Sequence, residues 1–145
     1  MIHLKQTKTK IFLLSIFLIT VIPVIIIYFE HAIVEFEAFE TAKTETKLIK
    51  TFGEGILFAG IGLGYVITTI FIFVKPEWKI PYFIILVGTV AVTILYYFRI
   101  FGIPIPFTEI VIVDFSSDWR DVITKICQQI LVIPVTALLL TRKVK

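Results

Sequence analysis

Three charged residues, Glu54, Arg99 and Asp121, have the types and the spacing from which ion-pair chemistry could arise. Each closes a long apolar run with a base at its other end: Lys75 follows Glu54 by 21 residues, Arg99 follows Lys79 by 20, and Arg142 follows Asp121 by 21. At about 1.5 Å per helical residue, all three lie about 30 Å from those bases, at one common depth. Because an arginine in apolar surroundings is costly unless it is paired, we expect Arg99 to form an ion-pair cluster with the two carboxylates.

The elements that position this cluster are four apolar segments of membrane-spanning length. Hydrophobic residues make up 58% of the 145-residue chain, and its mean hydropathy is +0.99. A soluble core of this size cannot bury so much apolar surface, whereas about 20 apolar residues suffice for a helix to cross a bilayer. The sequence predicts an all-α integral membrane protein, a single domain over residues 1–145 with four transmembrane helices at about 11–29, 54–74, 80–101 and 120–141.

Basic residues gather at one end of these segments. If the N-terminus, the turn at 75–79 and the C-terminus share a side, that side carries eight bases and one acid, Glu77, and the other side carries six bases and ten acids. Positive residues in short flanking segments stay in the cytoplasm. We therefore expect an antiparallel bundle in the cell membrane, with both termini cytoplasmic and the charged cluster near the outer boundary.

Two other interpretations of the charged cluster remain open. Each side chain could extend separately to the lipid headgroups, or the cluster could be a functional proton or ion site. Proton-coupled carriers usually place carboxylates deeper in the bundle. Structural pairing is therefore the interpretation that we favour.

Small residues recur along the second segment. Gly55 and Ala59, and likewise Gly60 and Gly64, are four residues apart, a spacing that lets helix backbones approach closely in lipid. We expect these four residues to mediate helix packing, within the bundle or between copies, and the alternative is that they line a pore or let a ligand approach the backbone. No lysine followed by serine or threonine comes after the glycines, so they do not indicate a nucleotide-binding loop.

The segments between the spans carry weaker patterns. Residues 30–53 mix charged and apolar residues, and helix formers dominate them. We expect one or two helical turns to extend there from the first span along the membrane interface. Residues 108–114 are rich in β-branched residues and could be extended.

Other polar residues in or beside the spans suggest local contacts. Gln128 or Gln129 is expected to hydrogen-bond a neighbouring helix, and Lys125 either packs against other helices or extends to the headgroups. His31, a single histidine among carboxylates at the membrane edge, is expected to be solvated and not to bind a metal. Cys127 is the one cysteine of the chain, which excludes an internal disulfide and a cysteine-based metal site.

Four short motifs resemble one known family. They are Glu54-Gly55-Ile56 opening the second span, Pro81-Tyr82-Phe83 after the 75–79 turn, Tyr96-Tyr97-Phe98-Arg99 ending the third span, and Asp121-Val122-Ile123 opening the fourth. Over residues 10–143 the chain resembles the phosphate-starvation-inducible PsiE family of small four-span membrane proteins. The resemblance implies that both termini are inside and that expression follows a stress, and it implies no particular activity.

These patterns favour a small non-catalytic membrane protein, either an accessory subunit of a complex or a stress-response component acting by contact. The sequence contains no nucleophile–base pair, no histidine-rich metal set and no cofactor motif, so we expect neither an enzyme nor a bound cofactor or metal. The expected partners are the lipid bilayer, other membrane subunits or further copies of the chain, and not nucleic acid. The alternative is a small oligomeric carrier or channel that uses the charged cluster. A row of polar groups from that cluster to the cytoplasmic side would favour it.

Overall fold

Four long helices make up most of the structure. The computed structural model describes the backbone of residues 2–101, 103–104, 111–112 and 119–141, and the side chains of residues 8–97 and 119–141. The helices are α1 (Ile2–Glu40), α2 (Glu45–Val74), α3 (Ile80–Phe101) and α4 (Trp119–Leu140). Each is long and apolar enough to cross a membrane, which confirms the prediction of an all-helical protein with four candidate spans.

A small strand pair accompanies the helices. In the described part of the connection between α3 and α4, β1 (Ile103–Pro104) pairs antiparallel with β2 (Val111–Ile112). The second of these strands lies inside the β-branched stretch 108–114, most of which is outside the described residues. Two residues per strand add little to the fold, which the helices determine.

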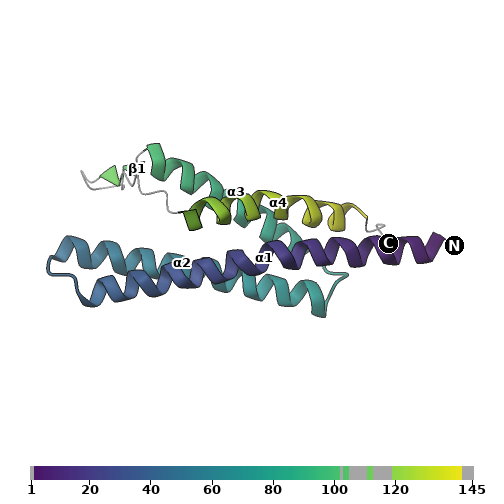
Figure 1. Ribbon diagram of the computed structural model, residues 1–145, viewed down its shortest axis with the longest axis horizontal. Helices are drawn as coiled ribbons and strands as arrows, with labels where there is room; N and C mark the ends of the chain where they lie inside the picture. The colour runs from purple at the N-terminus through teal and green to yellow at the C-terminus, as the bar shows by residue number, and fades with distance from the viewer. Residues whose placement is uncertain (1, 102, 105–110, 113–118, 142–145) are drawn as a thin grey trace.

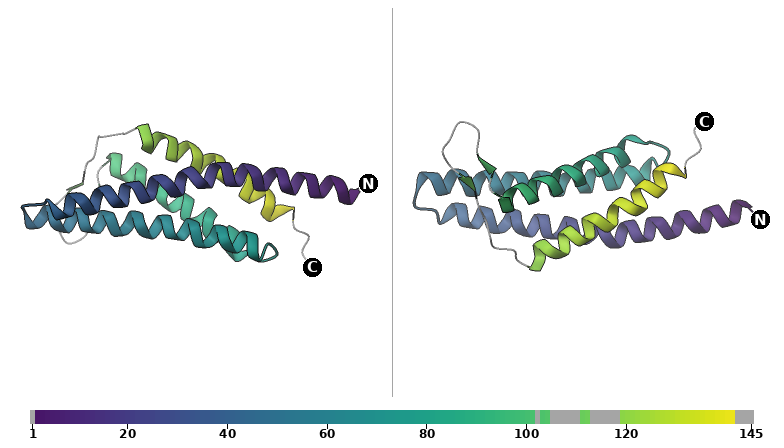
Figure 2. Two further views of the ribbon diagram at one scale, coloured as in Figure 1. Left: turned by 60° about the horizontal axis from the view of Figure 1, so that its bottom comes forward. Right: turned by 90° about the horizontal axis from the view of Figure 1, so that it is seen from above.

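The first two helices extend well past the segments that the hydropathy predicts. α1 continues to Glu40 and α2 begins at Glu45, so the chain reverses within residues 41–44 and the connection is helical on both sides. Phe52 packs against the rings of Phe36 and Phe39, at centroid distances of 6.4 and 5.3 Å. Figures 1 and 2 show this hairpin reaching beyond the ends of α3 and α4.

The helices pack unequally. α1 and α2 lie side by side along most of their length, α4 lies across α1, and α3 packs beside α4 (Figures 1 and 2). We call the end of the bundle marked by Lys75 and Lys79 the basic end, and the end marked by Glu54 and Asp121 the acidic end. These two ends give the direction along the bundle in which polar contacts are located below.

The buried stripe of each helix follows a helical period. In α1, Phe17, Val21, Val24 and Tyr28 are buried at intervals of three and four residues, whereas Ile19 between them is 72% exposed. The buried partners from the other helices are Tyr65, Ile72, Tyr82, Ile85, Leu131, Val135 and Leu138. Helices that are apolar all round need lipid on the faces that the bundle does not cover.

The small residues of α2 do not all pack within the chain. A Cβ atom at Gly55 would lie 2.9 Å from the ring of Phe36, and one at Gly62 would lie 3.3 Å from the ring of Phe29. By contrast, Gly60 and Gly64 are exposed, and a Cβ on either would meet no described atom within 4 Å. Ala59 is half-buried. The close approach of α1 and α2 therefore uses the face of Gly55 and Gly62, whereas the face of Gly60 and Gly64 packs against none of the described helices.

Replacing Gly62 by leucine is expected to destabilise the bundle by about 1–3 kcal/mol, because the new side chain must displace Phe29. Gly64→Leu is the matched control, and it should leave the melting temperature of the detergent-solubilised monomer unchanged or slightly higher, since leucine favours the helix. Equal effects of the two changes would contradict this assignment of faces. A loss of oligomers in Gly64→Leu alone would show that the second glycine pair joins copies.

Candidate functional site

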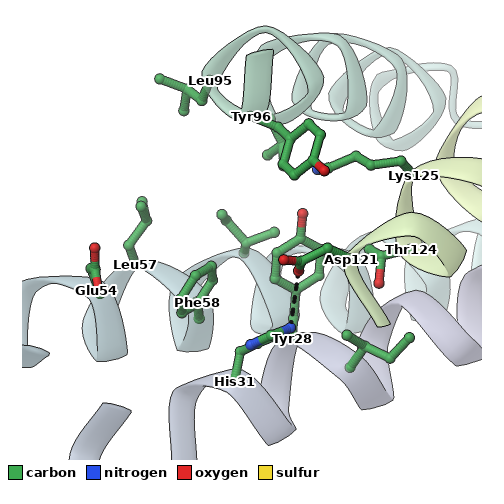
Figure 3. A pocket seen from close by; sticks show the side chains of 13 residues that line it. Tyr28, His31, Glu54, Leu57, Phe58, Leu95, Tyr96, Asp121, Thr124 and Lys125 are labelled. Carbon is green, nitrogen blue, oxygen red and sulfur yellow. Dashed lines mark ion pairs between the residues drawn. The ribbon is translucent and has the colours of Figure 1, made fainter. Parts of the chain in front are cut away.

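A cavity of about 210 Å³ lies between the four helices at the acidic end (Figure 3). Its wall is mostly apolar and includes Phe58, Ile61 and Val92. Polar side chains from every helix also line it: Tyr28, His31, Glu54, Tyr96, Asp121 and Lys125. An apolar hollow with a few converging polar groups is the composition typical of a small-molecule site.

His31 is half-buried against the cavity, so the expectation that it is solvated is wrong. Its Nε2 lies 3.2 Å from Oδ1 of Asp121, an ion-pair distance at which the ring N–H does not meet hydrogen-bond geometry. The imidazole packs against the ring of Phe58, with centroids 5.3 Å apart. His31 follows the buried Tyr28 by three residues, and this spacing places both side chains on one face of α1.

The structure brings together two members of the expected charged cluster. Glu54 and Asp121 both line the cavity, as their common depth predicts. The side chain of Arg99 lies outside the described residues, so its pairing with these carboxylates stays a prediction. Arg120 lies 3.8 Å from Glu30 beside the cavity, with exposures of 40% and 51%, and a pair so exposed contributes little to stability.

Lys125 lines the cavity from α4. Its Nζ donates a hydrogen bond to Oε1 of Gln128 at 3.1 Å, and it lies 4.6 Å from the ring centroid of Tyr96, within the range of a cation–π contact. Among the described side chains, no carboxylate oxygen lies within 4.0 Å of this ammonium group. Lys125 is therefore a half-buried cation whose direct partners are neutral.

Gln128 links all four helices through one hydrogen-bond network. Its side chain is fully buried, and its Nε2 donates to the hydroxyls of Tyr28 at 3.0 Å and Tyr65 at 3.2 Å. The Tyr65 hydroxyl in turn shares a hydrogen bond of 2.8 Å with Oγ1 of Thr89. This confirms the prediction that a glutamine of the fourth span bonds a neighbouring helix.

The network separates the cavity from an apolar layer toward the basic end. On each helix the buried residues beyond the network in that direction are mainly apolar, and they include Phe17, Ile72 and Leu131. The buried threonines there, Thr20 and Thr68, donate their hydroxyls to carbonyls of their own helices. Within the described residues, the polar groups of the cavity therefore do not continue as a row to the basic end.

The helical spacing of the buried residues indicates which polar side chains face the interior of the bundle, including Thr124 and Tyr28, which the sequence analysis did not assign to the site. Asp121, Thr124 and Gln128 share a stripe with the buried Leu131 and Val135, so polar groups continue the buried face of α4 into the acidic end. In α1, Tyr28 and His31 continue the stripe that begins at Phe17. In α2, Tyr65 lies on a stripe of small and polar residues that runs through Gly55, Gly62 and Thr68, and in α3 Thr89 continues the period of the buried Tyr82 and Ile85.

The arrangement of side chains is suited to binding. Hydroxyl, imidazole, carboxylate and ammonium groups face one hollow, where low polarity strengthens each electrostatic contact with a ligand. Among the described residues, no three His, Cys, Asp or Glu side chains gather closely enough to hold a metal ion. The chemistry available is thus hydrogen bonding and charge pairing.

Comparisons with protein-family models, with curated proteins and with solved structures find no match for this chain. The class of protein therefore follows from the geometry. It is an all-helical protein with four helices able to span a membrane and a polar-lined cavity between them.

The contact between His31 and Asp121 should appear as a coupling in a double-mutant cycle. We expect His31→Gln and Asp121→Asn to couple by about 1 kcal/mol in thermal stability, because the two side chains are 3.2 Å apart and only about a quarter exposed. The Glu30 and Arg120 pair is the control and should couple by less than about 0.5 kcal/mol because it is more exposed. Stronger coupling in the control pair would contradict the assignment. The cycle of Arg99→Leu with Asp121→Asn tests the arginine-centred cluster.

Proposed function

We propose that this chain is a non-catalytic multi-pass protein of the cell membrane that acts by binding a small molecule in the cavity at its acidic end. It would serve as an accessory subunit of a membrane complex or as a stress-response component similar to the PsiE family. In this proposal the bundle is antiparallel, and both termini and the 75–79 turn are cytoplasmic. The sequence supports this orientation, because the N-terminal segment, the 75–79 turn and the C-terminal segment together carry eight bases and one acid.

Ionisable side chains within the bundle are the observation that carries the binding proposal. His31, Asp121 and Lys125 line one hollow between helices that can span a membrane. Such groups are expensive at membrane depth, and where they occur they usually mark a pathway or a binding site. A subunit that only packed against its neighbours would need none of them.

The apolar layer favours a binding protein over a carrier or channel. Conduction requires polar or hydrated groups across the full thickness of the membrane. The cavity instead ends at the Gln128 network, and the layer around Phe17 and Leu131 lies beyond it. The cavity thus resembles a pocket with one closed end.

The orientation has a direct test. Reporter fusions to the C-terminus should be active only in the cytoplasm, and a reporter inserted near Ala42, in the turn between α1 and α2, only outside. An extracytoplasmic C-terminus would reverse the orientation or remove one span.

Native mass spectrometry tests the binding proposal. Protein purified from its own membranes in mild detergent should retain a stoichiometric small molecule, and Val92→Trp should lose it because the indole fills the cavity. Val90→Trp is the matched control on an exposed face of the same helix and should retain the molecule. Binding is excluded as the function if the natural protein retains nothing, or if both variants retain the same ligand. A protein that copurifies stoichiometrically would support the accessory-subunit role.

A further inference from the structure

We propose that the cavity takes an amphiphile with an anionic head, a carboxylate or a phosphate, which enters from the membrane between α2 and α3 and places its head at Lys125. This inference rests on the proposed binding function and adds the class of ligand. It follows from the charges that line the cavity, from the hydrogen-bond donors that face it, and from the position of its mouth.

No described carboxylate is in direct contact with Lys125, and Asp121, one helical turn earlier on α4, attracts it only from beyond ion-pair distance. Asp121 pairs with His31 at 3.2 Å, and Glu54 is engaged in interactions of its own within the chain. Lys125 has only the amide oxygen of Gln128 and the ring of Tyr96 as described partners. A buried ammonium group gains most from a directly bonded anion, because low polarity strengthens the attraction and unpaired burial is costly.

Hydrogen-bond donors are also available for such a head. An ammonium group has three N–H bonds, and Gln128 accepts one from Lys125. The hydroxyl of Tyr28, which lines the same cavity, accepts a hydrogen bond from Gln128 and keeps its own proton for a further acceptor. A carboxylate or phosphate oxygen could therefore bond Lys125 and Tyr28 together.

The most exposed residues of the cavity wall are apolar. Leu57 of α2 and Leu95 of α3 line the cavity and are 49% and 46% exposed, on faces that lipid would cover, and we place the entrance between them. Figure 3 shows both leucines on the side of the cavity away from Lys125. The volume of about 210 Å³ is below that of typical drug-sized sites. A cavity of this volume holds the head of the amphiphile and the first few carbons of its tail, while the rest of the tail lies in the membrane.

Binding of ten-carbon probes to the full chain in phosphatidylcholine nanodiscs tests this inference. The probes are decanoate, decanol and decyltrimethylammonium, which share a tail and differ in head charge. Decanoate should bind at least about tenfold more tightly than decanol, as expected for a charge-assisted hydrogen bond, and should raise Tm most. Lys125→Met should abolish this preference, whereas Lys125→Arg and the basic-end control Lys79→Met should keep it.

A second set of measurements distinguishes a lipid phosphate from a free carboxylate as the source of the anion. Nanodiscs that contain phosphatidylglycerol should stabilise the natural protein over Lys125→Met if a lipid phosphate fills the site, and should stabilise both equally if only a free carboxylate does.

A decanoate preference that survives in Lys125→Met, or tighter binding of decyltrimethylammonium, would overturn the anionic head and leave cavity binding intact. If no probe and no phospholipid binds in a Lys125-dependent way, the anion inference is wrong. The mass-spectrometric comparison of Val92→Trp with Val90→Trp then decides separately whether the cavity binds anything.

Discussion

Gln128→Leu is expected to lower the stability of the bundle by about 2–3 kcal/mol, although leucine suits an apolar helix. The change leaves Lys125 without its hydrogen-bond acceptor and Tyr28 without its donor, both in a site with little water. Tyr65 keeps its bond to Thr89, which limits the loss. A buried group that loses its partner costs about 1–3 kcal/mol, and interhelical bonds in membranes fall toward the lower figure.

Gln129→Leu provides the matched control for this prediction. Gln129 is the next residue of the same helix, and its side chain is exposed. Thermal unfolding in the same detergent should show no loss of stability, and a small gain is acceptable because leucine is the better helix former. A Gln129 variant as unstable as the Gln128 variant would mean that the network does not hold the four helices together.

Phe17→Ala is expected to destabilise the apolar layer by about 3 kcal/mol. Phe17 is fully buried and lies 6.4 Å from the ring of Phe73, so truncation leaves a cavity that neighbouring side chains fill only in part. We expect the lower end of the usual free-energy cost of replacing a buried phenylalanine by alanine, because packing rather than water exclusion holds helices together in a bilayer.

The control for the apolar layer is Phe12→Ala, one and a half turns earlier on α1. Phe12 is 64% exposed and would face lipid in either the folded or the dissociated bundle. Its loss should shift Tm by far less than that of Phe17. Similar shifts would indicate that α1 is rotated about its axis relative to the arrangement described above.

The sequence by itself determined where the four spans lie along the chain and the depth of their charges, but not that α1 continues to Glu40 and that α2 begins at Glu45. A bilayer requires about 20 apolar residues in a row, and hydropathy reports this requirement directly. α3 therefore matches the expected span, and α4 differs by one residue. Glu54 and Asp121 line one cavity because each is 21 residues from the base at the other end of its span, and equal lengths of helix place them at the same depth in the membrane.

Helix rotation is what only the tertiary structure decided. On a span that is apolar all round, hydropathy does not mark which face meets a neighbour. The sequence therefore could not distinguish Gly62, which packs on Phe29, from Gly64, which faces outward. For the same reason it could not show that His31 meets Asp121, or that Lys125 lies against Tyr96. These contacts depend on how side chains of different helices fit together, and that fit is fixed by packing between helices and not by the order of residues within one.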